Sequence, residues 1–347
     1  MRADLKTAAL TREGLPGDVT HHPYDAHGLP LMVEPASPAL ARDPLAVQSW
    51  FAEHHKTLEA LLPTYGGVVL RGFAIPDTAA FNAMIQCYDT DPNGYAGGLT
   101  PRKNIAGKVF EASRVPADQK IILHQEMGYL PSFPKMVAFY CLKPSETGGC
   151  TTIGDMRRFQ KQIPANLLDA VRERGVLYRR NYRAPGPVSD PLVALFRREW
   201  TDVLQVETAE QAEEACRAVG CEAVWEDDGS LSMRYRSSGF VNHSVTGEEV
   251  WFAQVQGMHF NEARLAQNYH KLNTAFPSGR PRPIEILFGD GGDIPEDMVT
   301  PLYEILDGLA VNLPYEHGDF MLLDNIYTAH GRQPFTGTRD VQVGLVF

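Results

Sequence analysis

A histidine and a glutamate lie two positions apart near the middle of the sequence, in the segment IILHQEMGY. In an extended chain, His124 and Glu126 would project to the same face. An imidazole and a carboxylate placed in this way could bind one metal ion, but a third ligand is still needed. A His-x-Glu pair alone is weak evidence for a metal site, because short motifs recur by chance.

A third candidate ligand occurs near the end of the sequence. The apolar run FMLLDN leads into IYTAHGRQPFTGTRDVQVGLVF, which places His330 just after a buried strand and Arg339 nine residues later. Two histidines and one carboxylate on one face of an octahedral Fe(II) leave the other positions open. A 2-oxo acid and O2 could occupy these positions, and Arg339 could pair with the far carboxylate of 2-oxoglutarate. The spacing therefore predicts an iron site formed by His124, Glu126 and His330.

Further motifs follow one another in a characteristic order: HQE, GGCTTIGD, NHSVTGEEVWF, FGDG and GDFMLLDNIYTAHGRQPFTGTR. Together they resemble the taurine dioxygenase-like superfamily of Fe(II)/2-oxoglutarate-dependent oxygenases. The order is most similar to the branch that contains the syringomycin-pathway aspartyl hydroxylase and clavaminate synthase-like amino-acid oxygenases. The resemblance extends from Gly66 to Phe347 and implies Fe(II), 2-oxoglutarate and O2 as cofactor and cosubstrates.

The resemblance also implies roles for residues outside the iron triad. Arg339 would pair with the distal carboxylate of 2-oxoglutarate, and the hydroxyl group of Thr151 would contact that carboxylate. Arg332, in the HGR motif, is a further candidate for the cosubstrate pocket. The presence of Glu126 argues against the halogenating variant of this chemistry, in which a small residue replaces the acid.

Substrate contacts are less well defined. Arg102, Asn104 and Arg183 are candidates for binding an amino-acid carboxylate, although surface arginines are common. Two positions depart from the family pattern, since Ala253 stands where asparagine is expected in WFNQ and Gln125 stands where asparagine is expected between the first two metal ligands. Both departures concern the identity of the substrate rather than the iron site.

The implied function is hydroxylation of an unactivated C–H bond in an amino acid, or in an amino-acid-derived substrate, in specialised metabolism. The substrate could be a free small molecule or be tethered to an aminoacyl carrier protein. Desaturation or cyclisation would share the hydrogen-abstraction step. Two other classes stay open: a zinc hydrolase, which leaves Arg339 without a role, and a metal-free binding protein with a jelly-roll cavity.

Composition excludes several other classes of protein. The 347 residues are 44% hydrophobic and 22% charged, as in ordinary folded domains, and the formal net charge of −11 disfavours nucleic acid and anionic lipid as partners. The five cysteines form no CxxC pair and are expected to be reduced thiols. Neither a signal peptide nor an unbroken run of about 18 apolar residues occurs, so a cytoplasmic enzyme without membrane contact is expected.

Strands dominate the regular segments. Short stretches rich in β-branched and aromatic residues are bounded by Gly, Pro or Asp: KMVAFYCL, VLYRRNY, SLSMRYR, EVWFAQVQ, PIEILFG, DFMLLDN and VQVGLVF. This pattern favours a mainly β fold, with a double-stranded β-helix (jelly roll) core and helical insertions, over a doubly wound parallel sheet. In VLYRRNY, Arg180 and Asn181 should face opposite ways, and we expect them to be exposed.

Helices are predicted at three places from caps and apolar spacing. One follows Asp77, one begins at Thr208 with a capping box and ends at Gly220, and one begins at Thr300 with Pro301 at its first turn. The remaining histidines, among them the six named here, are expected to be packing or surface residues: His54, His55, His243, His259, His270 and His317.

The domain organisation is predicted to be simple. Residues 1–44, which are rich in Pro, Gly, His and Asp, suggest an irregular arm, and residues 45–347 suggest a single oxygenase domain with an insertion around 183–230. Residues 94–120 and 183–200 are candidate lids over the active site.

Overall fold

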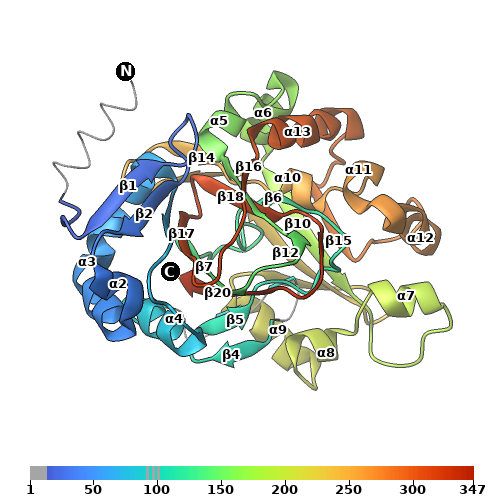
Figure 1. The fold of residues 1–347 in the computed structure, drawn as a ribbon. Coiled ribbons are helices and arrows are strands. Elements are labelled where there is room, and N and C mark those ends of the chain that lie inside the picture. Colours follow the sequence, from blue (N-terminus) through green and yellow to red (C-terminus); the bar gives the residue numbers. More distant parts are fainter. Residues whose placement is uncertain (1–13, 91–93, 96–97, 100–101) are drawn as a thin grey trace.

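The computed structural model describes residues 14–90, 94–95, 98–99 and 102–347, which form a β-rich core with helices around it (Figure 1). The strands are β1 (Val19–Pro23), β2 (Leu31–Pro35), β3 (Gly67–Leu70), β4 (Asn104–Ala106), β5 (Val109–Glu111), β6 (Ile121–His124), β7 (Met136–Lys143), β8 (Thr147–Gly148), β9 (Thr151–Asp155), β10 (Val176–Tyr182), β11 (Glu222–Trp225), β12 (Leu231–Ser237), β13 (Phe240–Asn242), β14 (Glu249–Trp251), β15 (Ile284–Phe288), β16 (Val311–Leu313), β17 (Phe320–Asp324), β18 (Thr328–Arg332), β19 (Phe335–Thr336) and β20 (Asp340–Val346). The helices are α2 (Pro38–Arg42), α3 (Pro44–Tyr65), α4 (Thr78–Ile85), α5 (Met156–Gln160), α6 (Ala165–Arg174), α7 (Pro191–Phe196), α8 (Trp200–Leu204), α9 (Ala209–Ala218), α10 (Val255–Met258), α11 (Glu262–Leu265), the 3-10 helix η1 (Ala266–Asn268), α12 (Tyr269–Ala275) and α13 (Glu296–Leu309).

Two sheets carry the functional strands. The larger has the order β1-β2-β3-β17-β7-β20-β5-β4, and the smaller has the order β16-β9-β18-β6. Side chains from both sheets meet in one buried cluster, in which Phe139 of β7 and Val343 of β20 join Ile153 of β9 and Leu313 of β16. The two sheets therefore pack face to face, and the predicted jelly-roll core is confirmed.

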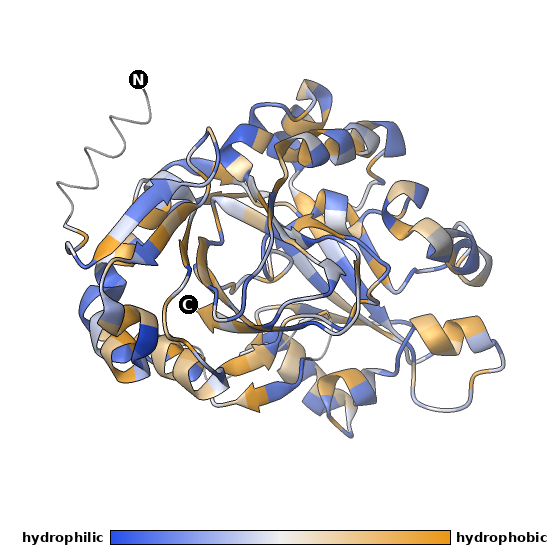
Figure 2. Ribbon diagram, in the orientation of Figure 1, coloured by the Kyte–Doolittle hydropathy of each residue, from blue (hydrophilic) through white to orange (hydrophobic). Residues whose placement is uncertain are grey.

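The central strands are hydrophobic on both faces because both faces are covered. Along β17, Phe320 and Leu322 join the cluster that includes helices α3 and α4, whereas Met321 and Leu323 join the cluster between the two sheets. Burying each such side chain contributes about 1.5–3 kcal/mol relative to leaving it exposed. In Figure 2 the helices at the edge carry hydrophilic and hydrophobic bands side by side, as expected for helices with one face in water.

A separate sheet of order β11-β12-β10-β15 extends the molecule beside this core. It contains the adjacent Arg180 and Asn181, which are 3% and 2% exposed, so the expectation of exposed strand charges is wrong. The amide of Asn181 donates to the carbonyl of Arg282 and to the carboxylate of Glu285. The guanidinium of Arg180 lies 5.6 Å from the ring centre of Tyr129, which lines the cavity described below.

Capping residues determine where most helices begin. Asp77 caps α4, and Thr208 with Gln211 forms the predicted capping box of α9. The predicted start of the third helix at Thr300 is wrong, because α13 begins at Glu296 and contains Pro301 in its interior. Acidic side chains in the first turn of α13 interact favourably with the positive end of the helix dipole.

The predicted strand EVWFAQVQ is shorter than expected, since β14 ends at Trp251 and α10 follows.

The N-terminal segment is more regular than predicted. Residues 1–13 of the expected arm lie outside the described residues, but β1 pairs antiparallel with β2, and β2 pairs parallel with β3. An irregular arm over 14–44 is therefore wrong. The sequence of β1, VTHHP, lacks the apolar alternation by which a strand is recognised. Among the described helices, none has the length and apolarity needed to cross a membrane.

Candidate metal centre

The pairing of β18 with β6 brings two of the predicted ligands together. His330 is the direct cross-strand partner of His124, and their ring centres lie 4.5 Å apart. Glu126 follows two residues after His124, in the turn just beyond β6, and its Oε2 lies 3.4 Å from Nε2 of His330. One ligand atom from each of the three side chains lies within 4.8 Å of the other two. This spacing suits a single ion bound by two imidazoles and one carboxylate.

Hydrogen bonds outside the triad orient its members. Nδ1 of His124 lies 2.9 Å from the carbonyl of Ile122; with the proton placed on Nδ1, Nε2 is left as a metal ligand. The backbone N–H of Glu126 donates to Oδ1 of Asn325, and the amide of Asn325 donates back to the carbonyl of Glu126. Asn325 was not predicted from the sequence, although it directly follows the buried strand β17.

The protonation states also favour metal binding. Burial, with a smaller effect of His330, lowers the pKa of His124 to about 4. Burial alone would raise the pKa of Glu126, but the imidazoles of His330 and His124 lower it to about 2. A neutral imidazole and a charged carboxylate are the forms that bind a metal ion, so this donor set fits Fe(II).

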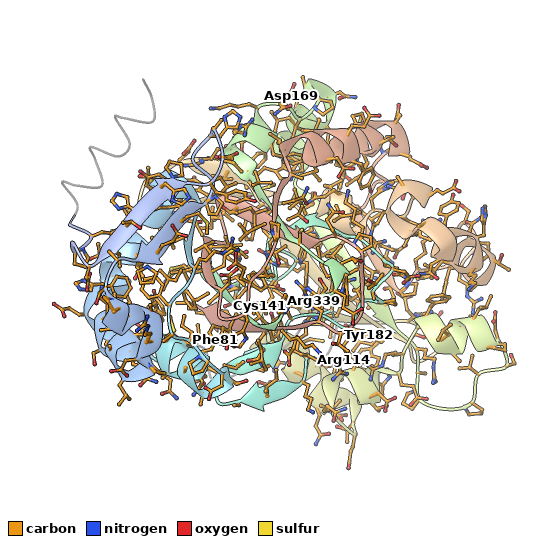
Figure 3. The ribbon with its side chains drawn as sticks, in the orientation of Figure 1. Phe81, Arg114, Cys141, Asp169, Tyr182 and Arg339 are labelled. Atoms are coloured by element: carbon orange, nitrogen blue, oxygen red, sulfur yellow. The ribbon has the colours of Figure 1, made fainter. Side chains whose placement is uncertain are left out.

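A cavity of about 380 Å³ opens beside the triad, and both Arg339 and Thr151 line it. Nε of Arg339 donates to the carbonyl of Gly149 at 3.1 Å, and Nη2 lies 3.5 Å from Oγ1 of Thr151. Arg339 directly precedes β20 and lies near the middle of the molecule, whereas Asp169 on α6 lies at its edge (Figure 3). The structure therefore brings the two predicted cosubstrate residues to the same cavity as the triad.

A tyrosine that the sequence did not single out adjoins this pair. The ring centre of Tyr315 lies 5.7 Å from the guanidinium of Arg339. Its hydroxyl group is buried, and this burial raises the pKa of Tyr315 well above the ordinary value. Tyr315 therefore stays neutral, and its ring lies beside the guanidinium of Arg339.

Arg332 also lines the cavity, but its hydrogen bonds assign it a different role from the predicted one. Nη1 donates to the carbonyl of Val115 at 3.0 Å, and Nη2 donates to the carbonyls of Pro116 and Gln119 at 2.6 and 2.7 Å. Burial, and to a smaller extent the charge of Arg339, lowers the pKa of Arg332 to about 10. The guanidinium thus fastens the segment 115–119 to β18.

The three candidate substrate residues lie in different places. Arg102 lines the cavity, with its guanidinium 5.5 Å from the ring centre of Tyr95. Asn104 is exposed and donates to a carbonyl of its own turn, and Arg183 pairs with Glu199 at 2.6 Å. Of the three, only Arg102 is brought to the cavity.

Of the two candidate lids, only one lines the cavity. Several described residues of the segment 94–120 line the cavity, among them Tyr95, Val115 and Lys120. The segment 183–200 contributes none of the lining side chains; it contains α7, which packs against α12.

The two departures from the family pattern lie outside the cavity lining. The amide of Gln125 donates to the carbonyls of Trp251 and Ile326, and Ala253 is fully buried. Gln254 in turn donates to the carbonyl of Gln125. These residues hold the turn that carries Glu126, which is a structural role that the sequence did not reveal.

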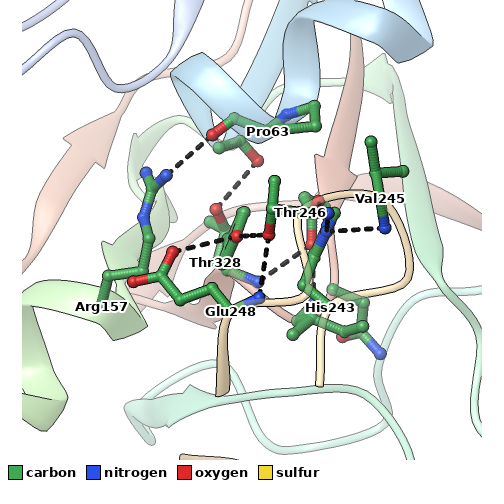
Figure 4. A network of polar contacts seen from close by, with 12 residues as sticks. Pro63, Arg157, His243, Val245, Thr246, Glu248 and Thr328 are labelled. Atoms are coloured by element: carbon green, nitrogen blue, oxygen red, sulfur yellow. Dashed lines mark hydrogen bonds and ion pairs between the residues drawn. The ribbon is translucent and has the colours of Figure 1, made fainter. Parts of the chain in front are cut away.

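His243 and His259, which are buried outside the triad, make structural contacts, as predicted. Nε2 of His243 lies 2.7 Å from Oδ2 of Asp324, and its Nδ1 accepts from the backbone N–H groups of Val245 and Thr246 (Figure 4). His259 bonds the carbonyl of Ile294 in the same manner. Within the described part of the chain, the triad is the one group of three such side chains with metal-binding spacing.

Comparison with known proteins gives an independent result. The model of the family described as "Taurine catabolism dioxygenase TauD, TfdA family" matches residues 33–345. A clavaminate synthase-like protein of Arabidopsis thaliana is 28% identical over 333 residues, which cover 93% of this chain and 94% of that protein. The dapdiamide synthesis protein DdaC of Enterobacter agglomerans is 27% identical over 298 residues, covering 85% of this chain and 86% of DdaC.

Solved structures resemble the fold over nearly the whole chain. PvcB, described as an Fe, alpha-ketoglutarate dependent oxygenase from an isonitrile synthetic pathway, matches with a TM-score of 0.51 and 15% identity, covering 96% of this chain and 93% of PvcB. AAD-2 in complex with Mn(II) and N-oxalylglycine matches with a TM-score of 0.52 and 13% identity, covering 94% of this chain and 96% of AAD-2. At these identities the likeness concerns the fold.

Proposed function

Since this chain belongs to the TauD/TfdA family and is a 2-oxoglutarate-dependent oxygenase, we propose that it hydroxylates an unactivated C–H bond of an amino acid or an amino-acid-derived compound. The observation that carries the proposal is one cavity that holds both the triad and the Arg339–Thr151 pair. A relative named for dapdiamide synthesis supports a role in specialised metabolism.

Separate groups of residues would bind the metal, bind the cosubstrate and exclude water. Fe(II), bound by His124, Glu126 and His330, would supply the oxidation in which O2 and 2-oxoglutarate yield succinate, CO2 and one oxygen atom inserted into the C–H bond. Arg339 would pair with the distal carboxylate of 2-oxoglutarate and fix its orientation, and Thr151 would donate a hydrogen bond to that carboxylate. The segment 115–119 would keep bulk water out of the cavity.

Arg102 is the predicted substrate residue that the geometry supports. Its charge lowers the pKa of Glu126, though less than the two histidines do, and it lines the same cavity as the metal ligands. Its guanidinium could therefore orient a carboxylate of the substrate near the reacting C–H bond. Substrates of both kinds, free or carried by an aminoacyl carrier protein, agree with this placement.

Anaerobic reconstitution tests the proposal. The protein is loaded with Fe(II) and 2-oxoglutarate, exposed to O2, and assayed by mass spectrometry for succinate and for products from a panel of amino acids. Succinate together with a product that has gained one oxygen atom supports hydroxylation, whereas a product that has lost two hydrogen atoms indicates desaturation or cyclisation. Turnover with Zn2+ in the absence of O2, without loss of 2-oxoglutarate, would instead identify a zinc hydrolase.

A further inference from the structure

The cavity is basic although the protein is acidic. Among the described residues that line it, the basic side chains outnumber the single acidic one, Glu126: Arg102, Lys120, Arg264, Arg332 and Arg339. The formal net charge of the chain is −11, so this local excess of positive charge is specific to the cavity. Buried cations are costly without a partner, and a cavity of this kind favours anionic ligands.

Three of the five cations already have partners. Lys120 forms an ion pair with Asp307. Arg332 donates to three carbonyls of the segment 115–119, and the nearby carboxylate of Asp118 partly balances its charge. Arg339 is assigned to the distal carboxylate of 2-oxoglutarate. The charge of Arg102 interacts with that of Glu126, and Arg102 already has a proposed role in orienting the substrate. Arg264 has neither a carboxylate partner among the described residues nor an assigned ligand.

Arg264 is held in place, but its charge is not balanced. Its Nε donates to the carbonyl of Gly257, and Nη1 donates weakly to the carbonyl of His259 at 3.4 Å. Neutral carbonyls orient a guanidinium without neutralising it. No carboxylate of the described residues forms an ion pair with Arg264, and burial lowers its pKa. The guanidinium is thus fixed beside the cavity before any ligand arrives.

We propose that Arg264 binds a carboxylate of the substrate, at a position separate from the site of 2-oxoglutarate. The inference rests on the proposed function, since it names a feature of the molecule that is oxidised there. A planar guanidinium matches the two oxygens of a carboxylate. Leu265 and Met258, which line the same cavity, would contact the apolar part of the substrate. The substrate is accordingly a free acid at this position, not an amide or a thioester.

The test compares acids with their neutral amides. The wild-type protein, loaded with Fe(II) and 2-oxoglutarate, is assayed for succinate release with each L-amino acid and with its α-carboxamide. Aspartate and glutamate are also compared with asparagine and glutamine, which separates a side-chain carboxylate from an α-carboxylate. We expect one series of acids to stimulate release more than the matching amides do.

Variants then assign this preference to Arg264. In Arg264→Gln the ratio of kcat/KM for acid over amide should fall on the order of 10- to 100-fold, as expected for loss of a charged hydrogen bond, and Arg264→Lys should retain part of it. Arg280→Gln is the matched control, because Arg280 also donates to a backbone carbonyl but does not line this cavity. A purely structural role of Arg264 would lower both rates equally and leave the ratio unchanged.

The outcomes separate the two proposals. If acids and amides stimulate equally, or if neither stimulates while succinate is still released without substrate, the assignment of Arg264 is overturned. If the ratio is unchanged in a folded Arg264→Gln protein, the assignment is likewise overturned. Absence of any 2-oxoglutarate-dependent succinate release from the wild-type protein would instead contradict the proposed function itself.

Discussion

Oε2 of Glu126 lies 3.4 Å from Nε2 of His330, a contact that joins the turn after β6 to the middle of β18. Both groups are less than 10% exposed. A carboxylate and an imidazole held this close, with a second imidazole beside them, form a site that a divalent cation would stabilise.

Glu126→Gln should weaken metal binding strongly. The amide keeps the size of the side chain but removes its charge. Because changes to groups outside the ligand sphere already cost about 10- to 100-fold in affinity, loss of a charged ligand should cost more than about 100-fold. Titration with Mn(II), followed by electron paramagnetic resonance, measures the change. Glu249→Gln, which alters an exposed partner of Arg172, is the control, and an unaltered Mn(II) affinity in Glu126→Gln would exclude Glu126 as a ligand.

Arg339→Gln should raise the KM for 2-oxoglutarate. Charged hydrogen bonds contribute about 1.5–3 kcal/mol, which corresponds to an increase on the order of 10- to 100-fold. The KM of Arg339→Lys should lie between those of the wild-type protein and Arg339→Gln, because a lysine keeps the charge but cannot pair with both carboxylate oxygens in one plane. The rate of succinate release at several concentrations of 2-oxoglutarate gives this KM, and Arg236→Gln, at an exposed position, is the control. A KM equal to that of the wild-type protein would show that another cation binds the cosubstrate.

The parts of the site that could be predicted lie in continuous motifs. The strands β7 and β17 are uninterrupted apolar runs, and His330 follows the second of them at a recognisable spacing. His124 and Glu126 are close in sequence, so their local motif suggested a shared ligand role. Each of these signals is contained in a short stretch of sequence.

The supporting residues could not be predicted, because their roles depend on contacts between distant segments. Asn325 holds the backbone of Glu126 from the far end of the chain, and Arg264 reaches the cavity from a short helix without a motif of its own. Arg332 was recognised by its HGR motif, but only the fold shows that the segment 115–119 crosses its guanidinium. Polar side chains of this kind look like ordinary surface residues in the sequence.

Asp290→Asn should change the stability of the protein in acid. Hydrogen bonds from Arg174 and from the backbone of Gly292 lower the pKa of Asp290 to about 2 from its ordinary value of 3.8. A lowered pKa in the folded state stabilises the charged form, so its contribution is complete above pH 3.8 and is lost as the pH falls toward 2. The difference in Tm between the wild-type protein and the variant should therefore vanish over that range.

Thermal unfolding between pH 6 and pH 2 measures this difference. Asp169→Asn, at an exposed position of α6 (Figure 3), is the control and should give a difference from wild type that does not follow this course. A gap between wild type and Asp290→Asn that stays constant down to pH 2 would contradict the role assigned to the Arg174–Asp290 pair.

Arg332→Gln should loosen the segment that covers the cavity. The wild-type guanidinium donates to the carbonyls of Val115, Pro116 and Gln119, and the shorter neutral side chain cannot reach all three. Since hydrogen bonds from a charged donor contribute about 1.5–3 kcal/mol each, amide exchange in 115–119 should accelerate by at least about 10-fold. Hydrogen–deuterium exchange with mass spectrometry measures this directly. A looser segment also admits water, so the yield of oxidised product per succinate should fall.

The control lies in the same part of the chain. Arg114→Gln removes a half-exposed guanidinium that pairs with Glu111 and does not contact the three carbonyls, so exchange in 115–119 and the product yield should stay as in the wild-type protein. If Arg332→Gln instead raised the KM for 2-oxoglutarate as much as Arg339→Gln does, with unchanged exchange, Arg332 would be a cosubstrate ligand. The three short contacts to carbonyls favour the first result, because a guanidinium so engaged has few donors left for a carboxylate.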